Sequence, residues 1–235
     1  MNSSTVRTRI PGPAGDIECA VDAPAGAARG VAVVCHPHPQ HGGTLDNKVA
    51  QTLARAFVQL GWRSVRFNFR GVGDSAGAWD EGVGEVDDTL AVIEAHRDPA
   101  IPFMLAGFSF GAYVAAQAAA RLPDDAKAQR LVLVGPSTER QQMALVPADT
   151  LVIHGESDDV VPLAATLAWA RPQNLPVIVF PGVGHFFPRP ARVAEKRNRA
   201  GTAAPRSALI HGPLVRCIAL RNTHSTSLFS SLGCQ

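Results

Sequence analysis

The stretch "IPFMLAGFSFGAYVAAQAAARL", Ile101–Leu122, changes from an apolar run to an Ala-rich run across a short turn. The first part is typical of a buried strand and the second favours a helix. Gly107 and Gly111 flank Ser109 in the pattern GxSxG, which predicts a nucleophile elbow when it lies between a strand and a helix. Because small flanking residues let the backbone turn sharply, we expect Ser109 to present its hydroxyl from a strained conformation.

Segments of the same two kinds alternate along most of the chain. Strands are expected at Thr5–Ile10, Asp16–Val21, Gly30–His36, Trp62–Phe69, Ile101–Phe108, 130–135, 150–155 and 176–180, and helices at Asp46–Gly61, 85–97, 111–122 and 162–171. This alternation predicts an α/β fold with a mostly parallel, twisted sheet of about eight strands and helices on both faces. The 14 residues between Gly135 and Thr150 are too few for a lid domain, so we expect an open site.

Composition and charge set further limits on the function. The 235 residues suit one α/β domain with its own core, and no apolar run approaches the length of a membrane span. The N-terminal stretch has no apolar segment of a signal peptide, so we expect a cytoplasmic protein. Neither a cysteine pair with CxxC spacing nor another redox pattern is present, and we expect four free thiols: Cys19, Cys35, Cys217 and Cys234.

Charge divides the chain into two parts. Residues 1–188 hold 14 Lys or Arg against 19 Asp or Glu, whereas residues 189–235 hold 8 against 1. We therefore expect one α/β domain at 1–188, mildly acidic and without a nucleic-acid or membrane partner, and a basic, irregular or poorly ordered tail at 189–235. A basic tail that tethers the chain to nucleic acid is an alternative that rests on charge alone.

A serine nucleophile needs a base to accept its proton and an acid to orient that base. Asp158 and Asp159 follow one predicted strand in "LVIHGESDDVVP", and His185 follows the next in "VIVFPGVGHFF". The chain order is then Ser, Asp, His. Two other residues are expected to have structural roles. His154 precedes a glycine in a turn, and Trp79 is expected to be a packing residue and not a binding residue.

Five segments carry a resemblance to a known family: "HPHPQHGGTLDNK", "RFNFRGVGDSAG", "GFSFGAY", "HGESDDVVP" and "GVGHFF". Together they resemble the α/β-hydrolase superfamily, in particular small bacterial serine hydrolases similar to dienelactone hydrolases. The resemblance implies that Asp158 is the catalytic acid, with Asp159 as the alternative. Dienelactone hydrolases carry cysteine at the elbow, whereas this chain has Ser109, which points toward general carboxylester hydrolysis.

Three histidines, His36, His38 and His41, lie in the loop after the third expected strand. They could form a metal site, an acid/base cluster, or a loop whose backbone matters most. Alignment with the family's oxyanion motif implies the last of these, with the backbone amides of His38 and Phe110 as the two donors to the oxyanion. We therefore expect no metal and no cofactor, because a zinc hydrolase would not need the serine elbow.

The sequence thus predicts a serine hydrolase that cleaves a small or medium carboxylic ester or thioester through an acyl-enzyme. Amide hydrolysis and acyl transfer use the same residues, and the sequence does not separate them. The alternative is a catalytically weak or silent binding module on the same scaffold, motivated by the tail after Phe187, which does not read as the helix that normally ends this fold. A homodimer stays open, since some members of the resembled family dimerise.

Overall fold

The computed structural model describes residues 5–187. The predictions for residues 189–235, and those for Cys217 and Cys234, lie outside the described residues. Cys19 and Cys35 are free and buried, and burial raises the pKa of both thiols to about 12. Within the described part of the chain, no helix combines the length and apolar character that a bilayer crossing needs.

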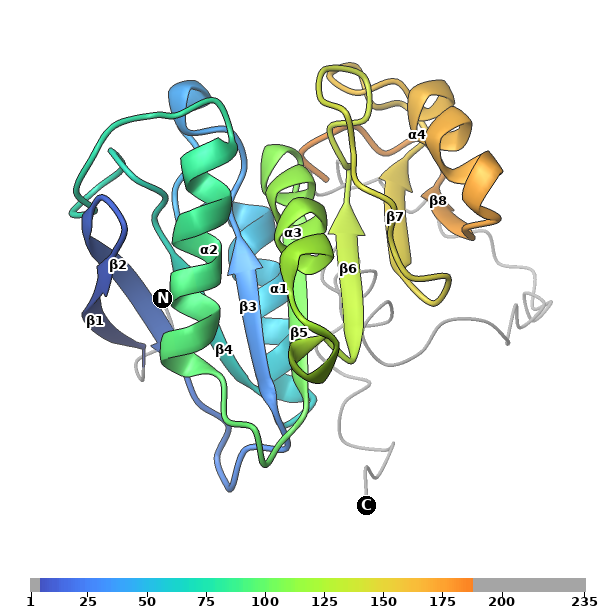
Figure 1. Ribbon diagram of the computed structural model, residues 1–235. Coiled ribbons are helices and arrows are strands. Elements are labelled where there is room, and N and C mark those ends of the chain that lie inside the picture. The colour runs from blue at the N-terminus through green and yellow to red at the C-terminus, as the bar shows by residue number, and fades with distance from the viewer. Residues whose placement is uncertain (1–4, 188–235) are drawn as a thin grey trace, which may run out of the picture.

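Within residues 5–187, eight strands and four α-helices follow one another in nearly the predicted places (Figure 1). The strands are β1 (Val6–Gly12), β2 (Gly15–Asp22), β3 (Val31–Cys35), β4 (Arg63–Phe67), β5 (Phe103–Phe108), β6 (Arg130–Val134), β7 (Leu151–Gly155) and β8 (Val177–Phe180). The helices are α1 (Lys48–Gln59), α2 (Val83–His96), α3 (Phe110–Arg121) and α4 (Leu163–Ala170), with short 3-10 turns at Pro39–His41, Asp124–Ala126 and Arg171–Gln173.

All eight strands form one sheet in the order β1-β2-β4-β3-β5-β6-β7-β8. The pairs β1–β2 and β2–β4 are antiparallel, and every pair from β4 to β8 is parallel. The carboxyl ends of the parallel strands therefore share one edge of the sheet, at the top of Figure 1. Loops that follow β3, β4, β5, β7 and β8 meet at that edge, which is where α/β sheets bind ligands.

Two apolar layers bury the sheet from both sides. On one face α2 and α3 pack over β3, β4, β5 and β6, through residues such as Val33, Leu105 and Leu133. On the other face α1 packs through Val49, Leu53 and Phe57 against the alternate strand residues. Figure 1 shows α2 and α3 in front of the sheet and α1 behind it. The prediction of helices on both faces is confirmed.

The ends of α1 show how local chemistry sets an element's limits. The sequence pattern predicted a helix from Asp46, but the helix begins at Lys48, because the Asn47 side chain accepts hydrogen bonds from the amides of Val49 and Ala50. At the other end Gly61 adopts a φ of 83°, as expected of a helix stop. The elements themselves were predicted; their end residues depended on the caps.

Residues 135–150, between β6 and β7, contain neither helix nor strand. In related folds a lid can arise at this point, and here the connection runs without one. Leu145 in its middle is 80% exposed. The prediction of an α/β-hydrolase fold without a lid domain is confirmed.

Candidate active site

The nucleophile elbow connects β5 to α3 through a single residue. Ser109 has a φ of 56° and a ψ of −120°, a conformation that side chains rarely adopt and that persists only where neighbouring structure enforces it. Its amide donates to the carbonyl oxygen of Val134 at 2.9 Å, which holds the turn against β6. A Cβ on Gly107 would collide with the Gly111 carbonyl oxygen, and one on Gly111 with the His36 carbonyl oxygen. The two glycines therefore let three backbones approach closely enough to impose the turn.

The turn after β7 carries the acid. One carboxylate oxygen of Asp158, Oδ1, accepts the amides of Val160 at 3.0 Å and Val161 at 2.8 Å. Burial raises the pKa of Asp158, but the hydrogen bonds from His185 and from these amides outweigh it and leave the pKa below its ordinary value. Asp159 is exposed. The structure therefore brings Asp158, not Asp159, to the other candidate residues.

His185 lies in the turn after β8 and joins the acid to the serine. Its Nδ1 is 2.7 Å from Asp158 Oδ2, and its Nε2 is 3.0 Å from Ser109 Oγ. A carboxylate can only accept, so Nδ1 carries the proton and Nε2 is free to accept from the serine hydroxyl. The ring is 2% exposed and packs between Phe108, at 5.0 Å between centroids, and Phe186, at 5.1 Å.

The side chain of His36 holds the loop after β3 in place through two hydrogen bonds. The imidazole is buried; Nδ1 donates to the Pro37 carbonyl oxygen at 2.6 Å, and Nε2 accepts from the Phe69 amide at 3.1 Å. Burial lowers the pKa of His36 to about 4, so the ring is neutral at neutral pH. Both nitrogens are used in tying the loop to the end of β4. His36 is therefore a backbone anchor.

His38 and Phe110, the two residues predicted to supply oxyanion donors, lie side by side, with ring centroids 5.0 Å apart. Among residues 5–187 neither backbone amide donates a hydrogen bond to another group. An oxyanion site requires two uncommitted amides, and Phe110 directly follows the serine in the chain. The geometry is compatible with the sequence-based assignment of both donors.

An aromatic cluster surrounds the His38 ring. Its centroid lies 4.4 Å from that of His41 and 4.6 Å from that of Trp79, which in turn contacts Phe110. Burial, together with the nearby His41 and Arg140, lowers the pKa of His38. The three histidines of this loop do not converge on one point, and within residues 5–187 no group of His, Cys, Asp and Glu side chains is placed to hold a metal ion.

The segment that carries Trp79 is held by a buried carboxylate that sequence reasoning missed. Glu85, in the first turn of α2 and 0% exposed, accepts the amides of Asp80 at 3.0 Å and Gly82 at 2.8 Å. The spacing Gly82-x-x-Glu85 is that of a capping box, which is the signal that could have revealed this role. Trp79 is thereby fixed beside His38, so the expected packing residue lines the candidate site.

Known proteins share the family and the fold of this chain. Residues 26–148 match the family model described as serine aminopeptidase, S33, a range that includes His38, Ser109 and Phe110 but not Asp158 or His185. A lidless α/β serine hydrolase of Xanthomonas campestris is 40% identical with a TM-score of 0.72, the match covering 80% of this chain and 88% of that one.

Two further relatives widen the comparison. An α/β serine hydrolase homologue of Coxiella burnetii is also 40% identical, with a TM-score of 0.68 over 77% of this chain and 89% of that one. An uncharacterized protein of Rickettsia prowazekii is 33% identical over 140 residues, which are 56% of this chain and 58% of that protein's length. The chain thus shares its fold with serine hydrolases of known structure, one of which also lacks a lid, and it belongs to the S33 serine aminopeptidase family within the α/β-hydrolase superfamily.

Proposed function

We propose that the protein is a serine hydrolase that cleaves small or medium carboxylic esters or thioesters through an acyl-enzyme. The observation that carries the proposal is the continuous hydrogen-bonded chain from Asp158 through His185 to Ser109, with links of 2.7 Å and 3.0 Å. All three residues are at most 9% exposed, so bulk water competes little with these bonds.

The reaction follows from the proton positions at these links. Ser109 Oγ attacks the acyl carbonyl carbon while its proton passes to His185 Nε2, and Asp158 stabilises the resulting imidazolium. The amides of His38 and Phe110 stabilise the negative oxygen of the tetrahedral intermediate. His185 then gives the proton to the departing alcohol or thiol. A water molecule, deprotonated by His185 in turn, releases the acid from Ser109.

The surroundings of the serine support a compact, uncharged acyl group. Phe108 and Phe186 place aromatic rings against His185, and the ring of Phe110, the residue after the serine, contacts His38. No lid exists between β6 and β7 to cover a long chain, so an extended acyl tail would stay in water. We therefore expect activity to peak at short or medium acyl chains.

Labelling with a fluorophosphonate, followed by peptide mass mapping, tests the proposal. Such a probe reacts only with a serine that has a working base and oxyanion site. We expect the label on the Ser109 peptide, no label in Ser109→Ala, and turnover of p-nitrophenyl esters that declines from butyrate to palmitate. Absence of label in protein that circular dichroism shows to be folded would overturn the proposal and favour the silent binding module.

Peptide hydrolysis, suggested by the family's description, is the second candidate. An aminopeptidase needs an acidic group near the serine to receive the substrate's α-ammonium. The neighbours that lower the pKa of His38 include Arg140, a cation that would repel an α-ammonium on that side of the candidate site. This charge arrangement favours the ester. Hydrolysis of aminoacyl p-nitroanilides at a higher kcat/KM than p-nitrophenyl butyrate would reverse the preference.

A further inference from the structure

A second buried histidine lies against the candidate catalytic acid. His154, at the end of β7, is 0% exposed, and its Nε2 is 3.4 Å from Asp158 Oδ2, the oxygen that binds His185. The same Nε2 is 2.9 Å from the carbonyl oxygen of Val161. The sequence suggested only a structural histidine before a turn, whereas the structure places His154 next to the candidate catalytic acid.

The partners of His154 fix its tautomer. A carbonyl oxygen can only accept, so Nε2 carries the proton and donates it to Val161, while Asp158 Oδ2 lies 3.4 Å from the same nitrogen. Nδ1 then accepts from the hydroxyl of Thr166 at 3.3 Å, and Thr166 is 3.2 Å from the Thr138 hydroxyl. Burial lowers the pKa of His154, and the ionisable groups that act on it are Asp158 and His185, so the ring is neutral at neutral pH.

These contacts give His154 control over the turn that holds the acid. Val161 accepts from His154 through its carbonyl oxygen and donates its amide to Asp158 Oδ1. A ring that fixes Val161 therefore also fixes the amide that orients the carboxylate. Thr166 belongs to α4 and is 0% exposed, so the ring is held in turn by a buried helix residue.

We propose that His154 and Thr166 form a positioning pair that holds the Asp158 turn and thereby the hydrogen bond between Asp158 and His185. This inference rests on the proposed serine hydrolase function. Neither residue touches the reacting atoms. Their removal is expected to slow the chemical step and to leave substrate binding unchanged, because the contacts that would form around the substrate stay in place.

The test compares His154→Leu and His154→Gln with wild type, using p-nitrophenyl butyrate and counting competent sites by fluorophosphonate titration. Leucine removes both ring nitrogens, whereas glutamine places an amide N–H near the position of Nε2. We expect His154→Leu to lower kcat per competent site by roughly three- to tenfold at unchanged KM, as loss of one orienting hydrogen bond implies. His154→Gln should recover most of that loss.

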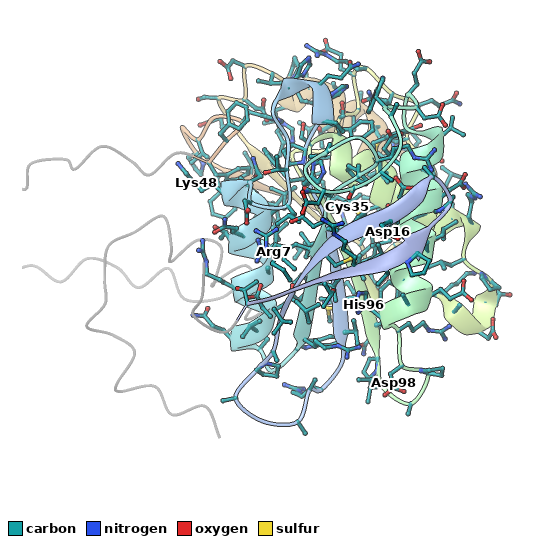
Figure 2. All side chains as sticks on the ribbon, turned by 90° about the vertical axis from the view of Figure 1, so that its left-hand side faces the viewer. Arg7, Asp16, Cys35, Lys48, His96 and Asp98 are labelled. Carbon is teal, nitrogen blue, oxygen red and sulfur yellow. The ribbon has the colours of Figure 1, made fainter. Side chains whose placement is uncertain are left out.

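Two further variants keep the test decisive. His96→Leu removes an imidazole at the end of α2, at the edge of the sheet opposite the candidate site (Figure 2), and should leave kcat and KM unchanged. Thr166→Val keeps the volume and removes the donor to Nδ1, and should lower kcat by about twofold. If His154→Leu does not fold, the comparison of His154→Gln and Thr166→Val with His96→Leu decides.

A readout that does not depend on turnover separates this inference from the proposed function. The most downfield imidazole N–H resonance in the proton NMR spectrum reports the bond from His185 Nδ1 to Asp158. We expect it to move upfield in His154→Leu and to stay in place in His96→Leu. An unchanged resonance together with wild-type kcat per site in His154→Leu would overturn the inference; lack of ester turnover and label in wild type would instead overturn the proposed function.

Discussion

The proposed nucleophile, Ser109, and the proposed base, His185, meet at one hydrogen bond, yet they belong to regions built in different ways. The central region, made of β3, β5 and α3, has strands that are almost wholly buried, and it holds Ser109 by close backbone packing. The edge region, residues 151–187, includes β8, the last strand of the sheet, whose residues are only partly buried. It holds Asp158 and His185 by hydrogen bonds between turns.

Because the two regions are built differently, substitutions in them should damage the protein in two different ways. In the central region an added atom has no space, so substitutions act on stability. In the edge region the proposed reaction depends on the orientation of two side chains, so substitutions that change their hydrogen bonds should act mainly on kcat.

Asp158→Asn should cause the largest loss. An amide cannot serve as the negatively charged acceptor of the Nδ1 proton of His185, and its own N–H can impose the wrong tautomer, so we expect kcat to fall by about 10⁴-fold. Thermal unfolding should change far less than activity. Asp159→Asn is the matched control, since Asp159 is exposed and lies one residue away. A comparable loss of kcat in Asp159→Asn would move the acid to that position.

Gly111→Ala should show the opposite pattern, a loss of stability in the central region. A Cβ at this position would collide with the carbonyl oxygens of His36 and Cys35, which are backbone atoms that cannot move aside. We expect the free energy of unfolding in urea to fall by about 3 kcal/mol, the upper end for overpacking.

The control for this change is Gly26→Ala, where an added Cβ meets nothing within 4 Å. Its stability should equal that of wild type or rise by about 0.5 kcal/mol, because alanine narrows the unfolded ensemble. Equal stability of the Gly26 and Gly111 variants would refute the view that close backbone packing holds the elbow.

Acidification should lower the free energy of unfolding through His36, the buried imidazole at the end of β3 in the central region. The pKa of His36 is about 4 in the folded chain and 6.5 when unfolded, so the unfolded chain binds a proton first as the pH falls. The contribution of neutral His36 to the free energy of unfolding is therefore complete above pH 6.5 and is lost progressively toward pH 4. The loss between pH 7 and pH 5 is about 2 kcal/mol.

Urea unfolding of wild type and of His36→Gln at pH 7 and at pH 5 measures how much of the lost stability is due to His36. Glutamine does not titrate, and its side-chain oxygen can still accept from the Phe69 amide. The loss of stability from pH 7 to pH 5 should be about 2 kcal/mol smaller in the variant than in wild type. The same loss in both proteins would mean that His36 does not govern the acid response.

The features that the sequence alone predicted also differ between the central region and the edge region. The alternation of apolar and helical segments located all eight strands, and the GxSxG turn located Ser109, because these signals are local in the chain. Asp158 and His185 followed from their places after two successive strands, since parallel strands bring their carboxyl ends together. The preference for Asp158 over Asp159 rested on family resemblance, and burial supplies its physical reason.

The residues that sequence reasoning missed act through packing between distant segments. His154 reads as a turn histidine until α4 places Thr166 against its ring, 12 residues further along the chain. Glu85 reads as an ordinary acid in a first helical turn until its carboxylate is found buried beneath the Trp79 loop. No spacing rule states which polar residue will be enclosed, because enclosure depends on how the layers pack.

Glu156→Ala should have the smallest effect and tests how the two turns of the edge region are joined. The Glu156 carboxylate accepts the amide of Gly182 at 2.8 Å and so links the turn after β7 with the turn after β8. Both residues are exposed, so water can replace this bond, and we expect a loss of at most about 1 kcal/mol in stability and about twofold in kcat. Two backbone bonds between the same segments remain, from Glu156 to Phe180 and from Ser157 to Val183, each 3.0 Å. Glu156→Gln, which keeps an acceptor without the charge, should match wild type in kcat and thermal unfolding. A loss of kcat above tenfold in Glu156→Ala would show that this surface carboxylate sets the distance between Asp158 and His185. The two backbone hydrogen bonds and the buried His154 would then have the smaller share.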